Sequence, residues 1–236
     1  NVILKPAKDD EETNWIATFY LAVDSDRFRL PNPIQSTTGG FVYGGWQAWE
    51  YMKGEHKRGR WIETIELCNQ FHQAIADFPE PADFDGREQT PWVVADKVAW
   101  GEVEIQHHPR IAPALEQLRK CLHPVDEKSQ LIHGDFGGNV LFSEGLRPAI
   151  IDFSPYWRSL SFAIGVIIAD AIVWEGADES LIEAGNGFDD FYQHLARAEL
   201  RRVIELESLY QTYGWETLEQ IDAHLPLIRA ISQRCN

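Results

Sequence analysis

The chain carries three polar residues, Asp135, Asn139 and Asp152, at the ends of short apolar runs. The first two lie in the segment LIHGDFGGNVLF (131–142), and the third ends the run AIID (149–152). Phosphoryl transfer needs such a set, in which one carboxylate orients the attacking hydroxyl and accepts its proton. An amide oxygen and a second carboxylate then hold magnesium on the nucleotide phosphates. The alternative is that these residues only cap turns and strand ends, which Asp and Asn favour.

The order of these runs resembles the catalytic segment of the aminoglycoside phosphotransferase and choline kinase group of small-molecule kinases. In that group the catalytic loop begins His-Gly-Asp, and the fold is that of the protein kinases, whose own loop begins His-Arg-Asp. The resemblance implies that Asp135 is the catalytic base and that Asn139 and Asp152 bind Mg²⁺. We expect His133 to be structural, with its ring tying the backbone of the loop.

The beginning of the chain matches a second part of this resemblance. The segment VILK (2–5) resembles the strand whose lysine contacts the α- and β-phosphates of the nucleotide, which assigns that contact to Lys5. Glu12, or Glu11 beside it, is then the ion-pair partner that holds the lysine in place. A lysine that ends a strand is otherwise an ordinary solvated surface residue.

The segment WQAWEYMKG (46–54) resembles the last strand of the kinase N-lobe and the hinge that follows it. The resemblance puts Trp49 at the gatekeeper-like position, beside adenine. The backbone carbonyl of Glu50 and the backbone amide of Met52 would then bond the edge of the adenine ring. A plain amphipathic strand with aromatic core residues explains the same side chains equally well.

Several features depart from the pattern of the group and indicate a divergent branch. The resemblance implies two strands joined by a glycine-rich phosphate loop before Asn1, where this sequence starts. The spacing from Asp135 to Asn139 is one residue shorter than usual, and the glycines at 137–138 predict a tighter backbone turn there. The acidic residue that many relatives carry before the next apolar helix is missing from residues 161–163.

The spacing of apolar side chains indicates the elements that position these residues. Helical spacing predicts helices near Trp15 to Tyr20, over residues 61–75 and 111–122, and in most of the chain after Phe162. Short β-type segments with glycine turns are predicted between residues 28 and 51. Further short strands are predicted within 130–142 and 148–153, and the proline-rich stretch 79–91 reads as a loop.

These elements predict an α+β chain, and the resemblance makes it a two-lobed protein-kinase-like fold. A truncated, β-rich N-lobe with the hinge is expected over residues 1–53. A mainly helical C-lobe, with the catalytic loop and the acceptor-side helices, is expected over residues 54–236. Arg201 and Arg202 lie on one of these helices, where we expect a solvated face.

The composition limits the partners and the compartment. The 236 residues include 37 acidic and 21 basic side chains, a net charge of −16, which makes nucleic acid and membrane surfaces poor partners. The longest apolar stretch, 162–173, is too short to span a bilayer. The cysteines (Cys68, Cys121 and Cys235) are three in number and far apart, which predicts free thiols and a cytoplasmic protein.

The resemblance implies transfer of the γ-phosphate of ATP, or of GTP, to a hydroxyl group of a small acceptor, with Mg²⁺ as cofactor. Residues 170–200 hold eight carboxylates, Asp189 and Asp190 among them, against Arg197 alone. This bias predicts an acceptor with an amine, such as an aminosugar or amino alcohol, unless the face is merely solvated. The rival is a degenerate, nucleotide-binding kinase-like protein with a binding or scaffold role. Nothing in the sequence predicts the oligomeric state.

Overall fold

The computed structural model describes residues 1–81 and 89–235, which fall into two compact units. The first unit comprises Asn1–Arg87 and Gln130–Tyr156, and the second comprises Glu88–Ser129 and Trp157–Asn236. The first unit therefore contains the segments predicted for the nucleotide site and the catalytic loop. The lobe boundary predicted at residue 53 follows the kinase resemblance rather than compactness, and it stays a prediction.

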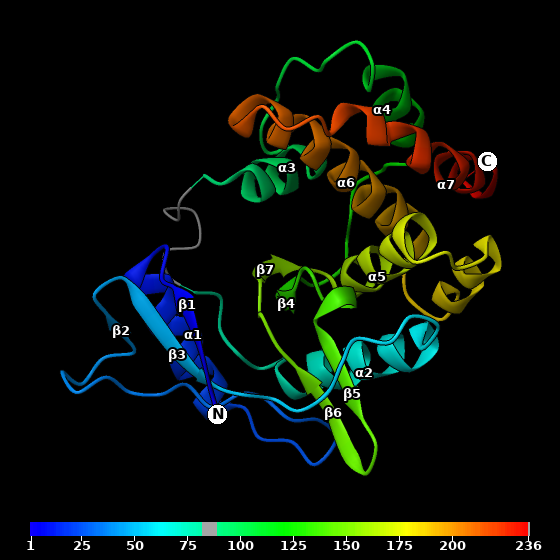
Figure 1. Ribbon diagram of the computed structural model, residues 1–236. Coiled ribbons are helices and arrows are strands. Elements are labelled where there is room, and N and C mark those ends of the chain that lie inside the picture. The colour runs from blue at the N-terminus through cyan, green and yellow to red at the C-terminus, as the bar shows by residue number, and fades with distance from the viewer. Residues whose placement is uncertain (82–88, 236) are drawn as a thin grey trace. The chain divides into compact units, whose positions relative to one another are not determined.

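The first unit begins with a small antiparallel sheet in the order β1-β3-β2. Strand β1 (Val2–Pro6) pairs with β3 (Trp46–Glu50), so that Lys5 lies opposite Gln47, and β3 also pairs with β2 (Val42–Tyr43). The turn at 44–45 consists of two glycines with positive φ, as a tight hairpin turn requires. Helix α1 (Asp10–Ala22) lies beside this sheet (Figure 1).

Helix α1 begins where the sequence places its acidic cluster. The carboxylate of Asp9 accepts the backbone N–H of Glu12 at 2.8 Å, and three acidic side chains occupy the first turn. Carboxylates are favoured there because the first N–H groups of a helix have no partner within it. The helix predicted around Trp15 to Tyr20 is thereby confirmed, and its buried residues include Phe19 and Tyr20.

The rest of the first unit carries the catalytic segment on short strands. Helix α2 (Trp61–Ala74) is the four-turn helix predicted from residue 61. Strands β5 (Val140–Ser143) and β6 (Leu146–Ile150) form a hairpin, and β4 (Gln130–His133) pairs with β7 (Pro155–Arg158), which runs on into the second unit. Strand β7 was not predicted. The 3₁₀ turn η1 (Gly137–Asn139) connects the catalytic loop to β5.

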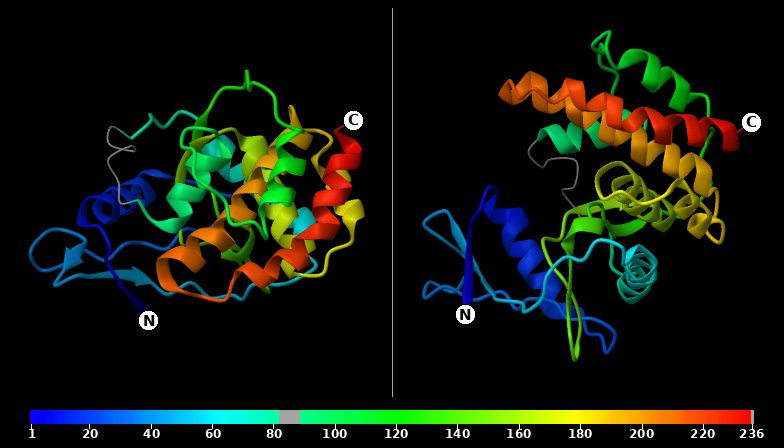
Figure 2. Two further views of the ribbon diagram at one scale, coloured as in Figure 1. Left: turned by 90° about the horizontal axis from the view of Figure 1, so that it is seen from above. Right: turned by 45° about the vertical axis from the view of Figure 1, so that its right-hand side comes forward.

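The second unit is helical, as predicted for the chain after Phe162. Helix α6 packs against α3, α4, α5 and α7, and Figure 2 shows α6 and α7 running side by side. Helix α5 is apolar on nearly every side, so most of it is buried. The elements are α3 (Pro91–Ala99), α4 (Ala112–Arg119), α5 (Leu160–Trp174), η2 (Glu179–Gly185), α6 (Phe191–Tyr213), η3 (Leu218–Gln220) and α7 (Ile221–Arg234).

Helix α3 was not predicted, although its start carries a recognisable signal. Thr90 accepts the N–H of Val93 at 3.3 Å, and Pro91 occupies the first helical position, where proline is well tolerated. The loop predicted over 79–91 therefore ends at the start of a helix. Residues 82–88 of that loop lie outside the described residues.

The prediction of three free thiols was wrong for two of them. Cys121, just after α4, and Cys235, just after α7, form a disulfide within the second unit, whereas Cys68 is free and buried. The two half-cystines are 114 residues apart in the chain, so no local pattern indicates that they meet. Within 1–81 and 89–235, no helix is long and apolar enough to cross a membrane.

Candidate active site

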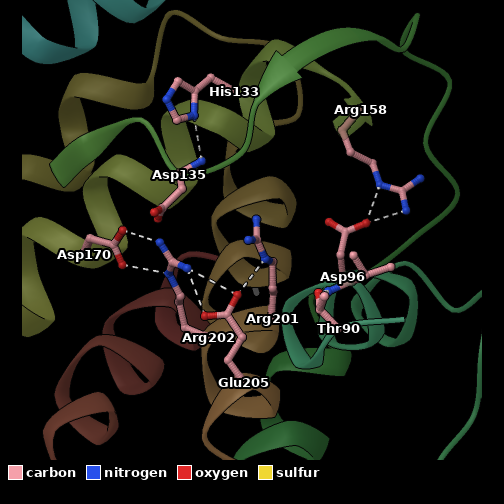
Figure 3. Close-up of polar contacts among 10 residues, drawn as sticks. Thr90, Asp96, His133, Asp135, Arg158, Asp170, Arg201, Arg202 and Glu205 are labelled. Atoms are coloured by element: carbon pink, nitrogen blue, oxygen red, sulfur yellow. Dashed lines mark hydrogen bonds and ion pairs between the residues drawn. The ribbon is translucent and has the colours of Figure 1, made fainter. Parts of the chain in front are cut away.

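His133 fixes the backbone of the catalytic loop, as predicted. Its side chain is fully buried, and its Nδ1 accepts the backbone N–H of Asp135 at 3.2 Å (Figure 3). Its Nε2 lies 3.1 Å from the carbonyl oxygen of Ile151. Because Nδ1 accepts, Nε2 carries the proton and donates it to that carbonyl. The ring therefore ties the residue before Asp152 to the amide of Asp135.

A second buried histidine, His72 on α2, supports the same loop from behind. Its Nε2 accepts the backbone N–H of His133 at 3.0 Å, and its Nδ1 donates to the carbonyl of Cys68 at 2.7 Å. Burial lowers the pKa of His72 from 6.5 to about 3, so the ring is neutral at physiological pH. Sequence reasoning missed this residue, because only the tertiary fold brings it to the loop.

Backbone hydrogen bonds next to Asp152 hold the three predicted site residues, Asp135, Asn139 and Asp152, close together. The N–H of Ile151 donates to the carbonyl of Asn139 at 3.0 Å, and the N–H of Gly134 donates to the carbonyl of Ser154 at 2.8 Å. A Cβ at position 134 would overlap the ring of Tyr156, which explains why glycine stands in the His-Gly-Asp motif.

The shortened loop closes through a 3₁₀ turn. The side-chain amide of Asn139 donates to the backbone carbonyl of Asp135 at 2.6 Å and lies 3.3 Å from its carboxylate. The tighter turn predicted at Gly137 and Gly138 is present, although neither glycine takes a positive φ. The turn is tight because of its i, i+3 hydrogen bond, which the N–H of Asn139 makes to Phe136 at 3.1 Å.

Asp152 has a backbone conformation that is unusual for a residue other than glycine. Its φ is +51°, in the left-handed region, and its side chain is 48% exposed. Such conformations persist only where surrounding contacts impose them, and they gather at functional sites. The carboxylate forms an ion pair with the ammonium group of Lys5.

A cavity of about 670 Å³ opens within the first unit, between the sheet and the Asp152 turn. Six of the eight residues predicted for the site line it, whereas Asp135 and Asn139 are absent from its wall. The six are Lys5, Glu12, Trp49, Glu50, Met52 and Asp152. This volume is in the range of small-molecule and cofactor sites.

Lys5 pairs with Asp152 among the described residues, and its predicted ion pair with Glu12 stays a prediction. Glu12 lines the same cavity. Glu12 lies in the first turn of α1, where the helix dipole favours a carboxylate whether or not a lysine is near. The left-handed turn at Asp152 presents the competing carboxylate to Lys5.

The chain just after the predicted hinge pairs with strand β5 through an antiparallel bridge between Glu55 and Phe142. Trp49 is only 8% exposed, and its indole N–H donates to the side chain of Gln47 at 2.7 Å. The Glu50 amide donates to the carbonyl of Asn32 at 2.9 Å. Among the described residues, no hydrogen bond engages the amide of Met52, which leaves a donor available at the cavity.

The acidic segment of the second unit is only partly available for a ligand. Arg202 on α6 binds Asp170 at 2.8 Å and Glu205 at 2.9 Å, and Arg201 binds Glu205 at 2.8 Å (Figure 3). The predicted solvated face at Arg201 and Arg202 was wrong, because Arg201 is 2% exposed. Asp189 and Asp190 are both exposed at the start of α6.

The family model described as "APH: Phosphotransferase enzyme family" matches residues 3–156. The chain belongs to this phosphotransferase family. The match includes the strand of Lys5, the hinge, the His-Gly-Asp loop and the Asp152 turn. Comparison with curated protein sequences finds no significant match.

Solved structures of small-molecule kinases share the fold of this phosphotransferase. An aminoglycoside phosphotransferase from Alicyclobacillus acidocaldarius aligns with a TM-score of 0.59 and 12% identity, over 99% of this chain and 86% of that one. Spectinomycin phosphotransferase in complex with ADP and spectinomycin aligns at 0.56 and 14%, over 99% and 85%. Plasmodium vivax ethanolamine kinase aligns at 0.54 and 11%, over 98% and 77%. The predicted protein-kinase-like fold is confirmed.

Proposed function

We propose that this phosphotransferase moves the γ-phosphate of ATP, or of GTP, to a hydroxyl group of a small molecule. One observation carries the proposal: hydrogen bonds around residue 151 hold the Asp135 loop, Asn139 and the Asp152 turn together in one unit. A capping role alone would not require this convergence. Lys5 and the cavity at the hinge complete the set that nucleotide binding needs.

Asp135 is the proposed catalytic base. The ring of His133 fixes its backbone amide, and its carboxylate orients the acceptor hydroxyl and accepts the proton as the oxygen attacks phosphorus. Lys5 would bind the α- and β-phosphates, with Glu12 in the same cavity as its predicted ion-pair partner. Adenine would lie against Trp49, between the carbonyl of Glu50 and the amide of Met52.

The residues fit magnesium. The side-chain N–H of Asn139 is held by Asp135, which leaves its amide oxygen as the free end, and Asp152 adds a half-exposed carboxylate. Such oxygens are the ligands that Mg²⁺ prefers. When bound, the ion would neutralise charge on the nucleotide phosphates. Asn139 and Asp152 would hold it, and Lys5 would then exchange its ion pair for the phosphates.

The proposed acceptor is an aminosugar or an amino alcohol. The negative charge at the start of α6, from Asp189 and Asp190, would attract a cationic group. Solved structures of the same fold are named for spectinomycin, hygromycin B and ethanolamine as their ligands or substrates. The rival function is nucleotide binding without catalysis. The direct pairing of Lys5 with Asp152 favours it, because that contact engages both groups that phosphates and metal need.

The first experiment measures thermal stability with ATP alone and with ATP plus Mg²⁺. Ligand at about a hundredfold excess over Kd stabilises the native state by about 2.7 kcal/mol, so the shift is measurable. We expect the larger shift with metal in the wild type, and no such difference in Asp152→Ala. Equal shifts with and without metal in both proteins would remove the metal assignment.

The second experiment measures ADP release with a panel of aminosugars, amino alcohols and neutral polyols. Asp135→Asn should lower turnover by about 10²–10⁴-fold while the MgATP shift persists, and Glu144→Gln on the exposed β5–β6 turn should leave both unchanged. Full turnover in Asp135→Asn would contradict the mechanism. Nucleotide binding without turnover for any acceptor would support the rival.

The same panel tests the charge of the acceptor. Asp189→Asn combined with Asp190→Asn should raise KM for amines, and high salt should do the same in the wild type. Asn tolerates the left-handed φ of +45° at position 190, so the variant keeps its backbone. A preference for neutral acceptors that the double variant leaves unaltered would remove the cationic acceptor but not the kinase.

A further inference from the structure

We infer that Tyr20, on α1, is a positioning residue that holds the Asp152–Phe153 turn and so orients the carboxylate of Asp152. The Tyr20 hydroxyl accepts the backbone N–H of Phe153 at 3.2 Å. This amide directly follows the left-handed residue, at φ +51°. The bond therefore acts on the peptide unit whose direction decides where the Asp152 side chain points. That this carboxylate binds metal rests on the proposed function.

The Tyr20 hydroxyl supplies a hydrogen-bond acceptor for this amide, which packing alone does not. Phe153 is 6% exposed and Tyr20 is 5% exposed, so the amide has little access to water. A buried N–H without an acceptor is unfavourable, and the Tyr20 oxygen removes that penalty only while the turn keeps its conformation. A phenylalanine at position 20 would fill the same space but would leave the amide without this acceptor.

Helix α1 contacts Phe153 through Trp15, Phe19 and Tyr20, and the last two act on different parts of it. The ring of Phe19 stacks on the ring of Phe153, with centroids 4.6 Å apart and planes at 17°. Tyr20 instead bonds the backbone, and its ring lies tilted to Phe153 at 6.0 Å. Phe19 therefore anchors the side chain and Tyr20 anchors the peptide, which provides a matched pair of variants.

Tyr20 also contacts the predicted adenine end of the cavity. Its ring meets Trp49 edge to face, with centroids 5.3 Å apart and planes at 74°, and both residues line the cavity. One side chain thus touches the gatekeeper-like tryptophan and the turn that carries Asp152. Burial raises the pKa of the Tyr20 phenol, so its hydroxyl stays neutral.

The test compares Tyr20→Phe with Phe19→Leu and needs no ligand in its first arm. Amide hydrogen exchange is measured at Phe153 in the free protein. We expect Tyr20→Phe to speed exchange at Phe153 more than at the rest of the first unit. Phe19→Leu should lower the overall melting temperature, with exchange rising evenly across the unit. Unchanged relative protection of Phe153 in a folded Tyr20→Phe protein would overturn the inference.

The second arm measures the Mg²⁺ concentration that gives half of the MgATP-induced thermal shift. Tyr20→Phe should raise it about tenfold, the lower end of the effect of residues that orient metal ligands, with the shift for metal-free ATP unchanged. Phe19→Leu should leave the midpoint near the wild-type value. Equal midpoints in all three proteins, or an equal rise in both variants, would overturn the positioning role. If the thermal shift of the wild type with ATP does not depend on Mg²⁺ while the exchange result is as expected, the proposed function fails. The inference that Tyr20 holds the turn is then still supported.

Discussion

The buried, neutral His72 should make the free energy of unfolding decrease as the pH is lowered. Its folded pKa of about 3 lies below the ordinary 6.5, so the native state binds fewer protons here than the unfolded chain. This stabilising contribution is complete above pH 6.5 and is lost progressively as the pH falls from 6.5 towards 3. Between pH 7 and pH 5 the unfolded chain gains most of a proton at this site, and linkage gives a loss of about 2 kcal/mol.

The assay is urea unfolding of the wild type and of His72→Gln at pH 7, 6 and 5. The variant loses packing and starts from a lower stability, but its glutamine does not titrate, so its fall between pH 7 and pH 5 should be smaller by about 2 kcal/mol. Ile65→Val, which loses packing on the same helix but removes no titrating group, is the control and should keep the wild-type slope. Parallel pH profiles for the wild type and His72→Gln would refute the reasoning, because other titrating groups are common to both.

Two further predictions concern stability. Gly54 has a φ of +147°, and a Cβ added there would come within 2.9 Å of the side chain of Leu141. Gly54→Ala should therefore lower the free energy of unfolding in urea by about 2–4 kcal/mol. Gly59→Ala, at a positive φ but in open space, should lower it less, and equal losses would exclude the clash. Cys121→Ser, or reductant, should lower stability by up to about 5 kcal/mol, the chain-entropy value for a loop of this length; a wild type indifferent to reductant would exclude the disulfide in solution.

The chemistry of the site was predictable from sequence because it is local. Asp135, Asn139 and Asp152 stand at the ends of apolar runs, and the resemblance of this segment to the catalytic segment of small-molecule kinases predicts phosphoryl transfer. Helices such as α2 and α4 were predictable for the same reason, since apolar residues recur at helical spacing. The strong pattern of residues 131–153 thus carried most of the functional interpretation.

The supporting contacts were not predictable, because each joins residues far apart in the chain. His72 reaches the backbone of His133, and Tyr20 reaches the turn after Asp152, without any motif that marks either residue. The ion pair between Lys5 and Asp152 also depends on a left-handed turn that no sequence pattern predicts. Periodicity reports which face of an element is buried, but not what it is buried against.

The shortened loop illustrates how such contacts hold a residue in place when the spacing of a motif changes. Asn139 is held twice: its side-chain amide donates to the carbonyl of Asp135, and its own carbonyl accepts the N–H of Ile151. Both bonds fix the same residue between the proposed base and Ile151, the residue before Asp152. A loop with one residue fewer therefore need not release the asparagine, since its orientation is set by these two anchors rather than by the number of residues between them.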